Sequence, residues 1–136
     1  VSKDANQHIL IINVESVDGI KALDELLDID GLDAVLIGPH DLSCSLGIPE
    51  QYDHPEFLTA CETIFSKARA AGIGAGIHFW GDIAQQARLL GMGANILIHS
   101  ADILLLKKHL SEDIAEIKNA IGTTEGTSPS SSDVNI

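Results

Sequence analysis

The sequence has little of what marks a membrane-spanning or secreted protein. Only 4% of its 136 residues are aromatic, and its two cysteines, Cys44 and Cys61, form neither a CxxC pair nor a disulfide framework. No stretch approaches the roughly 18 consecutive apolar residues that span a bilayer. The polar residues 1–8 do not have the pattern of a signal peptide. We therefore expect a protein of the reducing cytoplasm in which both cysteines are packing residues.

Basic residues are scarce as well. Eight Lys and Arg side chains stand against 20 Asp and Glu, which gives a formal net charge of -12. Such an acidic chain is a poor match for nucleic acid or for an anionic membrane surface. Apolar residues make up 45% of the sequence and charged residues 21%, a balance typical of a folded domain with a core.

What the sequence does contain is a regular alternation of strand and helix patterns. Strands are predicted at residues 9–14, 34–37, 73–77 and 95–98. Helices are predicted at residues 17–29, 55–70, 82–90 and 102–120, the last with a break near 110–111 as an alternative. Residues 41–52 are expected to form a loop. Residues 1–121 are expected to form the folded domain, and the Ser-rich residues 122–136 a disordered tail.

This order of elements predicts an α/β fold with parallel strands and helices packed outside them. Four β/α units are half of an eightfold (β/α)₈ barrel, which needs about 250 residues. A small doubly wound sheet is the alternative. Periodicity alone does not separate these two architectures.

Polar side chains follow the predicted strands where each strand ends. Glu15 ends the first strand, Asp41 follows the second, and His78 and His99 follow the third and fourth. Ligands gather at the carboxyl ends of parallel strands in both architectures, so we expect these residues on one rim. Two carboxylates suit Mg²⁺ or Mn²⁺, which keep several waters and leave positions open for a 2-oxo acid.

The Gly38-Pro39 pair is suited to a ligand-binding turn. Gly38 lets the backbone come close to a ligand, and Pro39 fixes the turn. The amides of His40 and Asp41 are then free to hold a substrate carboxylate. The simpler interpretation is an ordinary turn, with Asp41 as a helix cap and Glu15 as a solvated strand end.

Two other function classes fit parts of the pattern. His40, His78 and His99 with Asp41 would suit a barrel-type zinc hydrolase, because zinc prefers nitrogen ligands. A non-catalytic module, either flavodoxin-like or a truncated binding domain, would also carry acidic strand ends.

Several runs of residues resemble one enzyme family. Asn-Val-Glu-Ser at 13–16 and Gly-Leu-Asp-Ala-Val-Leu-Ile-Gly-Pro-His-Asp-Leu-Ser at 31–43 are similar to the HpcH/HpaI aldolase family, and shorter runs at 46–47, 54–56, 70–72 and 76–77 agree. The resemblance covers residues 1–121 and implies the C-terminal half of a TIM barrel. It further implies a divalent metal (Mg²⁺, Mn²⁺ or Co²⁺) and reversible cleavage of a 4-hydroxy-2-oxo acid to pyruvate and an aldehyde.

The resemblance also assigns site residues. Its metal ligands fall on Glu15 and Asp41, and its substrate-contacting backbone falls on Gly38, Pro39 and His40. Two substrate positions depart from the family pattern: Asn13 replaces a common Gln, and His78 replaces an apolar residue lining the pocket.

The family's catalytic histidine and its substrate-binding arginine belong to the first half of the barrel, so no catalytic residue is assigned in this chain. Arg69 and Arg88 both fall on predicted helices, away from the strand ends. We therefore expect little or no aldolase activity from this polypeptide alone. The resemblance also implies a homo-oligomer, often a hexamer.

Overall fold

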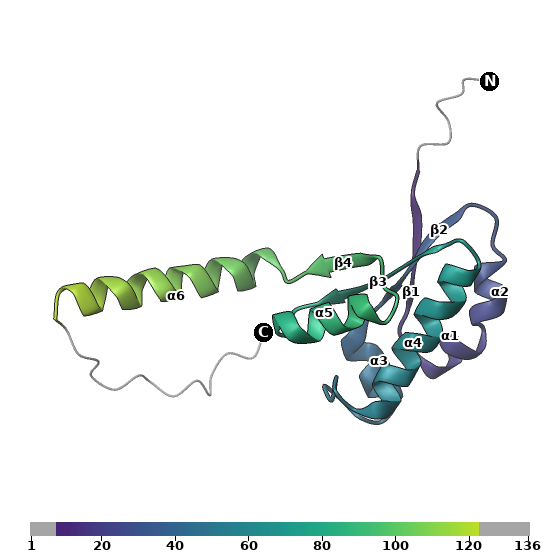
Figure 1. Ribbon diagram of the computed structural model, residues 1–136, viewed down its shortest axis with the longest axis horizontal. Coiled ribbons are helices and arrows are strands. Elements are labelled where there is room, and N and C mark those ends of the chain that lie inside the picture. The colour runs from purple at the N-terminus through teal and green to yellow at the C-terminus, as the bar shows by residue number, and fades with distance from the viewer. Residues whose placement is uncertain (1–7, 123–136) are drawn as a thin grey trace, which may run out of the picture. The chain divides into compact units, whose positions relative to one another are not determined.

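The four strands form one parallel sheet. The computed structural model describes residues 8–122. The strands are β1 (Leu10–Val14), β2 (Leu32–Ile37), β3 (Gly74–Phe79) and β4 (Ile96–His99). All neighbours pair in parallel, and the spatial order β1-β2-β3-β4 is the order along the chain (Figure 1). Doubly wound sheets reverse direction at a switch point, whereas barrels add each strand on the same side. The sheet therefore follows the barrel type of connection.

Six helices connect or follow the strands. They are α1 (Val17–Lys21), α2 (Leu23–Leu27), α3 (Pro39–Ser45), α4 (Pro55–Ala70), α5 (Ile83–Gly91) and α6 (Asp102–Ala120). The chain divides into two compact units at Ser100 and Ala101, and the first holds the whole sheet with α1 to α5. The prediction of four β/α units with parallel strands is confirmed.

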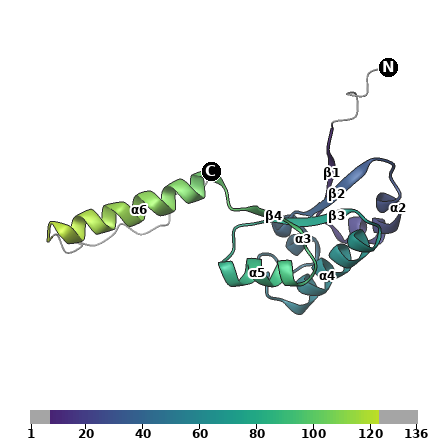
Figure 2. The ribbon, with the colours of Figure 1, turned by 45° about the horizontal axis from the view of Figure 1, so that its top comes forward.

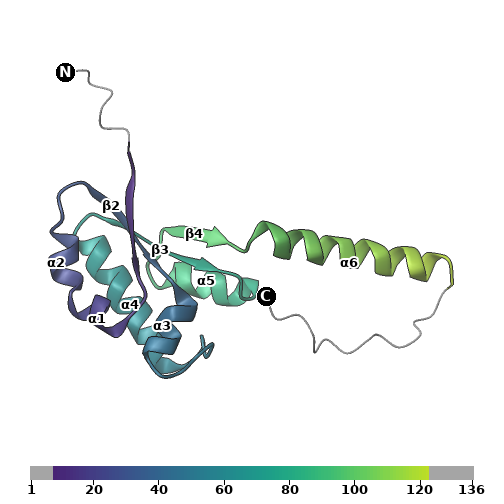
Figure 3. The same cartoon turned by 180° about the vertical axis from the view of Figure 1, so that it is seen from behind.

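The core lies between the sheet and the helices of the first unit. Val14, Ile37 and Ile77 are partners across β1, β2 and β3, and each is at most 1% exposed. Helix α4 packs its own fully buried side chains, including Phe57 and Phe65, against this row. Figure 2 shows α3, α4 and α5 on the same side of the sheet, and the view from behind shows α2 beside α4 (Figure 3). Burying each large apolar side chain contributes roughly 1.5–3 kcal/mol.

The opposite face of the sheet carries the alternate residues of each strand. Asn13, Leu36, Gly76 and Ile96 form one row across the four strands. Among residues 8–100, no helix covers this face, and Ile98 keeps 42% of its surface exposed. Parallel sheets normally have both faces covered, so this face has the character of a barrel interior that is open.

Three predicted elements differ from the structure. The helix expected over 17–29 is two helices, because Ala22 (φ -85°, ψ 4°) leaves the helical region, and this break accompanies the complete burial of Leu23. The loop expected over 41–52 begins as α3, with Pro39 in its first turn. Helix α6 is continuous, since the Ser111 hydroxyl donates to the Lys107 carbonyl (2.8 Å) instead of capping a new helix.

Helix α6 belongs to the second unit and is described by itself. None of its side chains is buried, although it carries apolar residues at helical spacing along much of its length. No helix within residues 8–122 is long and apolar enough to cross a membrane. Of the tail predicted from Gly122 onward, residues 123–136 lie outside the described part of the chain.

Candidate functional site

One pocket gathers the seven residues that the family resemblance assigned as metal or substrate ligands. It encloses about 210 Å³ at the carboxyl ends of β1, β2 and β3. Its lining is Asn13, Glu15, Leu36, Ile37, Gly38, Pro39, His40, Asp41, His78 and Trp80. The structure therefore brings together the seven predicted site residues from three separate β/α units, although their roles stay predictions.

Strand alternation explains why these side chains meet. Side chains two apart on a strand point to the same face. Asn13 on β1, with Glu15 two residues later, shares the open face of the sheet with Leu36 on β2, which is its register partner. His78, the last but one residue of β3, lies on the same face, because Gly76, two residues before it, pairs with Leu36. The pocket thus lies on the uncovered face of the sheet, at the carboxyl ends of the strands.

Glu15 lies directly against Gly38. A Cβ atom added to Gly38 would meet the Glu15 Oε2 at 2.5 Å and the Glu15 Cβ at 3.1 Å. No real Cβ makes the first contact, so the carboxylate occupies space that only a glycine leaves open. Gly38 itself has φ -86° and ψ 96°, which any residue can adopt. The glycine therefore makes room for the Glu15 side chain in its present position, and its backbone conformation does not call for glycine.

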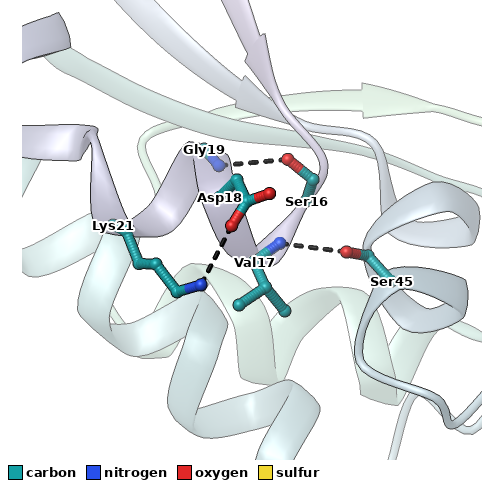
Figure 4. Close-up of polar contacts among 6 residues, drawn as sticks. All are labelled: Ser16, Val17, Asp18, Gly19, Lys21 and Ser45. Atoms are coloured by element: carbon teal, nitrogen blue, oxygen red, sulfur yellow. Dashed lines mark hydrogen bonds and ion pairs between the residues drawn. The ribbon is translucent and has the colours of Figure 1, made fainter.

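The corner between β1 and α1 is fixed just after Glu15 (Figure 4). The Ser16 hydroxyl caps α1 by accepting from the Gly19 amide at 3.0 Å, as the sequence predicted. The Val17 amide donates to the Ser45 hydroxyl, also at 3.0 Å, which ties this corner to the end of α3. Because α3 also carries Asp41, this bond links the backbones that hold the two candidate metal ligands.

Helix α3 presents His40 and Asp41 in its first turn. The Leu42 amide closes that turn on the Gly38 carbonyl at 2.9 Å, and Pro39 has no N–H. Within residues 8–122, the amides of His40 and Asp41 have no backbone or side-chain acceptor. The first amides available to a ligand are therefore those that the sequence pointed to.

The His40 ring is held on both nitrogens. Its Nδ1 lies 3.5 Å from a Glu50 carboxylate oxygen, and its Nε2 lies 3.9 Å from the Cys44 sulfur. The buried Ser43 hydroxyl donates to the His40 carbonyl (2.7 Å) and accepts from the Glu50 amide (3.0 Å). Because both ring nitrogens already have neighbours, the group of His40 that is free to bind a ligand in the pocket is its backbone amide.

The two cysteines differ in environment. Cys61 is a fully buried core residue, as expected, and burial raises its pKa to about 12. Cys44 is exposed, so the prediction that it is a packing residue is wrong. The Cys44 sulfur lies 3.9 Å from the His40 Nε2, one helical turn away on α3. Burial, the Glu50 charge and Cys44 together raise the pKa of Tyr52.

His99 does not join the pocket. It pairs with Phe79 in the sheet register and so faces the helix side. Its Nδ1 lies 2.7 Å from the Gln86 Oε1, and the buried Gln86 amide donates to the Gly81 carbonyl at 2.6 Å. The expectation that His99 shares the rim is therefore wrong, and the zinc set of three histidines does not assemble. Residues 8–122 contain no group of three His, Cys, Asp or Glu side chains placed to hold a metal ion.

Trp80 is a lining residue for which the sequence left a packing role and a pocket-lining role open. It follows β3 by one residue and lies two residues after His78, so the alternation that places His78 on the open face also places Trp80 there. The two rings meet edge to face, with centroids 5.5 Å apart and planes at 80°. Trp80 keeps 44% of its surface exposed.

A larger pocket of about 410 Å³ lies on the helix side, between α1 and α4. Apolar and hydroxyl side chains form most of its lining, among them Val17, Ile20, Leu46 and Thr59. It contains none of the strand-end residues. Size alone therefore does not identify the chemical site, and the smaller pocket with its two carboxylates is the better candidate.

Comparison with known proteins agrees with the site. Residues 2–107 match the family model of the HpcH/HpaI aldolase/citrate lyase family. Over 111 residues the chain is 41% identical to the 2-keto-3-deoxy-L-rhamnonate aldolase of Escherichia coli strain K12, which covers 81% of this chain and 41% of that enzyme.

Solved structures show the same relationship. An HpcH/HpaI aldolase from Desulfitobacterium hafniense DCB-2 matches with a TM-score of 0.75 and 29% identity over 86% of this chain and 45% of that one. A citrate synthase, SbnG, matches with a TM-score of 0.74 and 30% identity over 85% and 47% of the two chains. The chain thus spans less than half the length of the relatives it matches, and its sheet corresponds to part of their barrel. On this evidence the chain belongs to the HpcH/HpaI aldolase/citrate lyase family.

Proposed function

We propose that this chain supplies the C-terminal half of a metal-dependent aldolase, a lyase that cleaves a 4-hydroxy-2-oxo acid to pyruvate and an aldehyde. The observation that carries the proposal is the meeting of Glu15 and Asp41 in one strand-end pocket, within a chain of an aldolase family. The substrate, the metal and the oligomeric assembly, for which we expect a homo-oligomer, are all parts of this proposal.

The residues present fit a hard divalent cation. Glu15 and Asp41 are oxygen donors, and the space above Gly38 is kept open for the Glu15 carboxylate. Mg²⁺ and Mn²⁺ need only one or two protein carboxylates, because waters and substrate oxygens complete their coordination. When bound, such a metal supplies Lewis-acid polarisation of the 2-oxo group.

The other lining residues would bind and orient the substrate. The free amides of His40 and Asp41, exposed by Gly38 and Pro39, are placed to donate to a substrate carboxylate. Asn13 lies on the same face of β1 as Glu15 and can hydrogen-bond an oxygen of the same ligand. These groups hold the pyruvyl end of the substrate at β1 and β2.

This chain does not contain the acid–base machinery that the family resemblance implies. Arg88 forms an ion pair with Asp53 at 3.0 Å and lies on α5, and Arg69 ends α4 on the helix side of the sheet. Neither arginine lines the pocket. We therefore infer that the chain binds metal and pyruvate but cleaves substrate only when the complementary half of a barrel is supplied.

Metal binding with matched variants tests the proposal. We expect Mn²⁺ to bind the chain, observed by loss of the free-ion electron paramagnetic resonance signal, and pyruvate with Mg²⁺ to raise the melting temperature. Glu15→Gln and Asp41→Asn should each weaken Mn²⁺ binding at least about tenfold, since each removes one of two charged ligands.

Two exposed carboxylates outside the pocket serve as controls. Glu62→Gln on α4 and Asp30→Asn before β2 change the net charge by the same amount and should leave Mn²⁺ affinity unchanged. Equal loss of affinity in all four variants would show non-specific attraction of cations to an acidic protein, and the proposed site would be rejected.

A further inference from the structure

We propose that two copies of this chain close into one eight-stranded barrel, in which the outer edge of β4 on each copy pairs with the outer edge of β1 on the other. The inference goes beyond the proposed function, because it names the partner that covers the open face of the sheet. That face is the one shared by Asn13, Leu36, Gly76 and Ile96. The pairing concerns the sheet itself and requires neither metal nor substrate.

The two edge strands have nothing that blocks a further strand. Among residues 8–122, no strand pairs with the outer edge of β1 or of β4. Exposed edges in folded proteins usually carry a charged residue, a proline or a bulge that prevents such pairing. Strand β1 (Leu-Ile-Ile-Asn-Val) and strand β4 (Ile-Leu-Ile-His) contain neither Pro nor Asp, Glu, Lys or Arg. The register shift in β1 is confined to Leu10 and Ile11 at its start, so the rest of that edge can accept a strand.

The side chains on the open face are those of a barrel interior. Strand alternation places no Asp, Glu, Lys or Arg of the four strands on this face. Its two edges carry Ile11 on β1 and Ile98 on β4, which are 45% and 42% exposed. Parallel sheets normally bury both faces, so the partner that covers this face must itself be apolar.

Ile96 leaves the outer edge of β4 clear. A Cβ atom added to Gly76 would lie 2.6 Å from the Ile96 Cβ, and one added to Gly74 would lie 3.0 Å from the Ile96 Cδ1. The Ile96 side chain therefore lies over the glycines of β3, toward the middle of the sheet. An incoming strand can then approach β4 from outside without displacing it.

A second copy supplies the number and the direction of strands that closure needs. The sheet adds β1 to β4 on the same side, and barrels of this type close at eight parallel strands. When β4 of one copy lies beside β1 of the other, the order continues without reversal. Twofold rotation about the barrel axis makes both junctions identical. The solved relatives agree in size, since this chain covers 45% of the Desulfitobacterium hafniense aldolase and 47% of SbnG.

Closure would also complete the candidate site. The pocket is formed by the ends of β1, β2 and β3, and within residues 8–122 no strand lies on the far side of β1. In the ring, the carboxyl end of β4 from the second copy lies beside Glu15. The two copies then place their pockets on the same rim of one barrel.

Sedimentation velocity on the full chain tests the stoichiometry. We expect a concentration-dependent shift from the 14.4 kDa of one chain to about twice that mass. The measurement is made with and without Mg²⁺, because closure brings the carboxylates of both copies to one rim. One-chain mass at every concentration in both conditions overturns the proposal. Open-ended larger assemblies overturn it too, since a closed ring has no edge left to extend.

Two isoleucine substitutions test which surface is buried. Ile98→Asp should weaken dimerisation at least about 100-fold, because the ring encloses two unpaired aspartates in its apolar interior. Ile83→Asp is the matched control, since Ile83 is 81% exposed on α5, on the helix side of the sheet, and its dimerisation should stay unchanged (Figure 2). Circular dichroism shows whether each variant folds. Equal effects of the two substitutions overturn the proposal.

Hydrogen exchange tests the pairing of the edges and needs no variant. In the closed barrel every strand has two neighbours, so amides of both β1 and β4 should exchange more slowly as the concentration of the chain rises. Two sheets stacked face to face would cover the open face but leave both edges unpaired. A dimer without concentration-dependent protection in β1 and β4 therefore overturns the barrel. A dimer with that protection supports it whatever the Mn²⁺ titrations show, so the two proposals can fail separately.

Discussion

Substitution of Gly38 by alanine tests whether the position of Glu15 matters for metal binding. The backbone of Gly38 (φ -86°, ψ 96°) accepts alanine without strain. The added methyl group, however, would lie 2.5 Å from the Glu15 Oε2 and 3.1 Å from its Cβ. The Glu15 side chain must therefore leave its present place, while the strand beneath it can stay.

The structure predicts separate magnitudes for stability and for binding. Alanine restricts the unfolded chain and favours folding by about 0.4–1 kcal/mol, and displacement of Glu15 opposes this by a similar amount. We therefore expect the free energy of unfolding to change by less than about 1 kcal/mol. Mn²⁺ affinity should fall about 10- to 100-fold, the range typical when a ligand keeps its identity but loses its orientation.

Both quantities can be measured on the same two proteins. Urea unfolding gives the stability, and Mn²⁺ titration by electron paramagnetic resonance gives the affinity. Gly91→Ala is the matched control, because Gly91 ends α5 and an added Cβ there meets nothing within 4 Å. Helix propensity predicts a gain of up to about 1 kcal/mol for Gly91→Ala, with unchanged Mn²⁺ affinity.

An unchanged Mn²⁺ affinity in Gly38→Ala would refute the reasoning. It would mean either that Glu15 is not a ligand or that its place above Gly38 has no bearing on binding. A loss of affinity in the Gly91 variant as well would trace the effect to stability and not to the pocket.

Four other predictions concern the fold and its two cysteines. Phe65→Ala should destabilise the chain by about 3–5 kcal/mol in urea unfolding, because Phe65 is a core residue that is 0% exposed. A smaller loss would indicate that the core closes around the cavity. Ser16→Ala should cost about 0.5–2 kcal/mol through loss of the cap on α1, and Ser16→Asp should recover most of it. The pKa of Cys61 is raised from 9.0 to about 12, so its contribution to stability is complete below pH 9 and is lost as the pH rises toward 12. The unfolding free energies of the natural chain and of Cys61→Ala should therefore converge over that range. At neutral pH, iodoacetamide should label Cys44 and leave Cys61 unmodified until the chain is unfolded.

Local sequence patterns were enough for most elements of the fold. Helix α4 begins at Pro55 and ends at Ala70 as predicted, because a first-turn proline, a clear apolar stripe and a following glycine act together. The strands were found to within two residues at each end for the same reason. The order of the strands in space had to come from the structure, because the alternation of elements is common to barrels and doubly wound sheets.

The composition of the pocket was predictable wherever a residue's position along the strand fixed its face. Glu15 and Asp41 were found from their places after β1 and β2 and from the family pattern. His99 was misplaced because the sequence shows that it ends a strand but not which partner it has, and its pairing with Phe79 turns it to the helix side. The role of Trp80 stayed open, because a tryptophan after a strand packs in the core as readily as it lines a pocket.

The negative charge of the pocket limits which partner could cover the open face of the sheet. Glu15 and Asp41 both line it, and none of its ten lining residues is Lys or Arg. Two carboxylates that share a pocket repel each other, and closing the pocket would strengthen the repulsion by removing water. The uncovered face of the sheet leads into this pocket, so whatever covers that face also closes the site. A complementary half-barrel can therefore cover the apolar strands at low cost only if cationic charge, from a metal ion or from its own side chains, enters the pocket with it. This coupling predicts that the divalent metal proposed to bind Glu15 and Asp41 should strengthen association with a complementary half-barrel. Glu15→Gln should weaken the effect of the metal without weakening association in its absence.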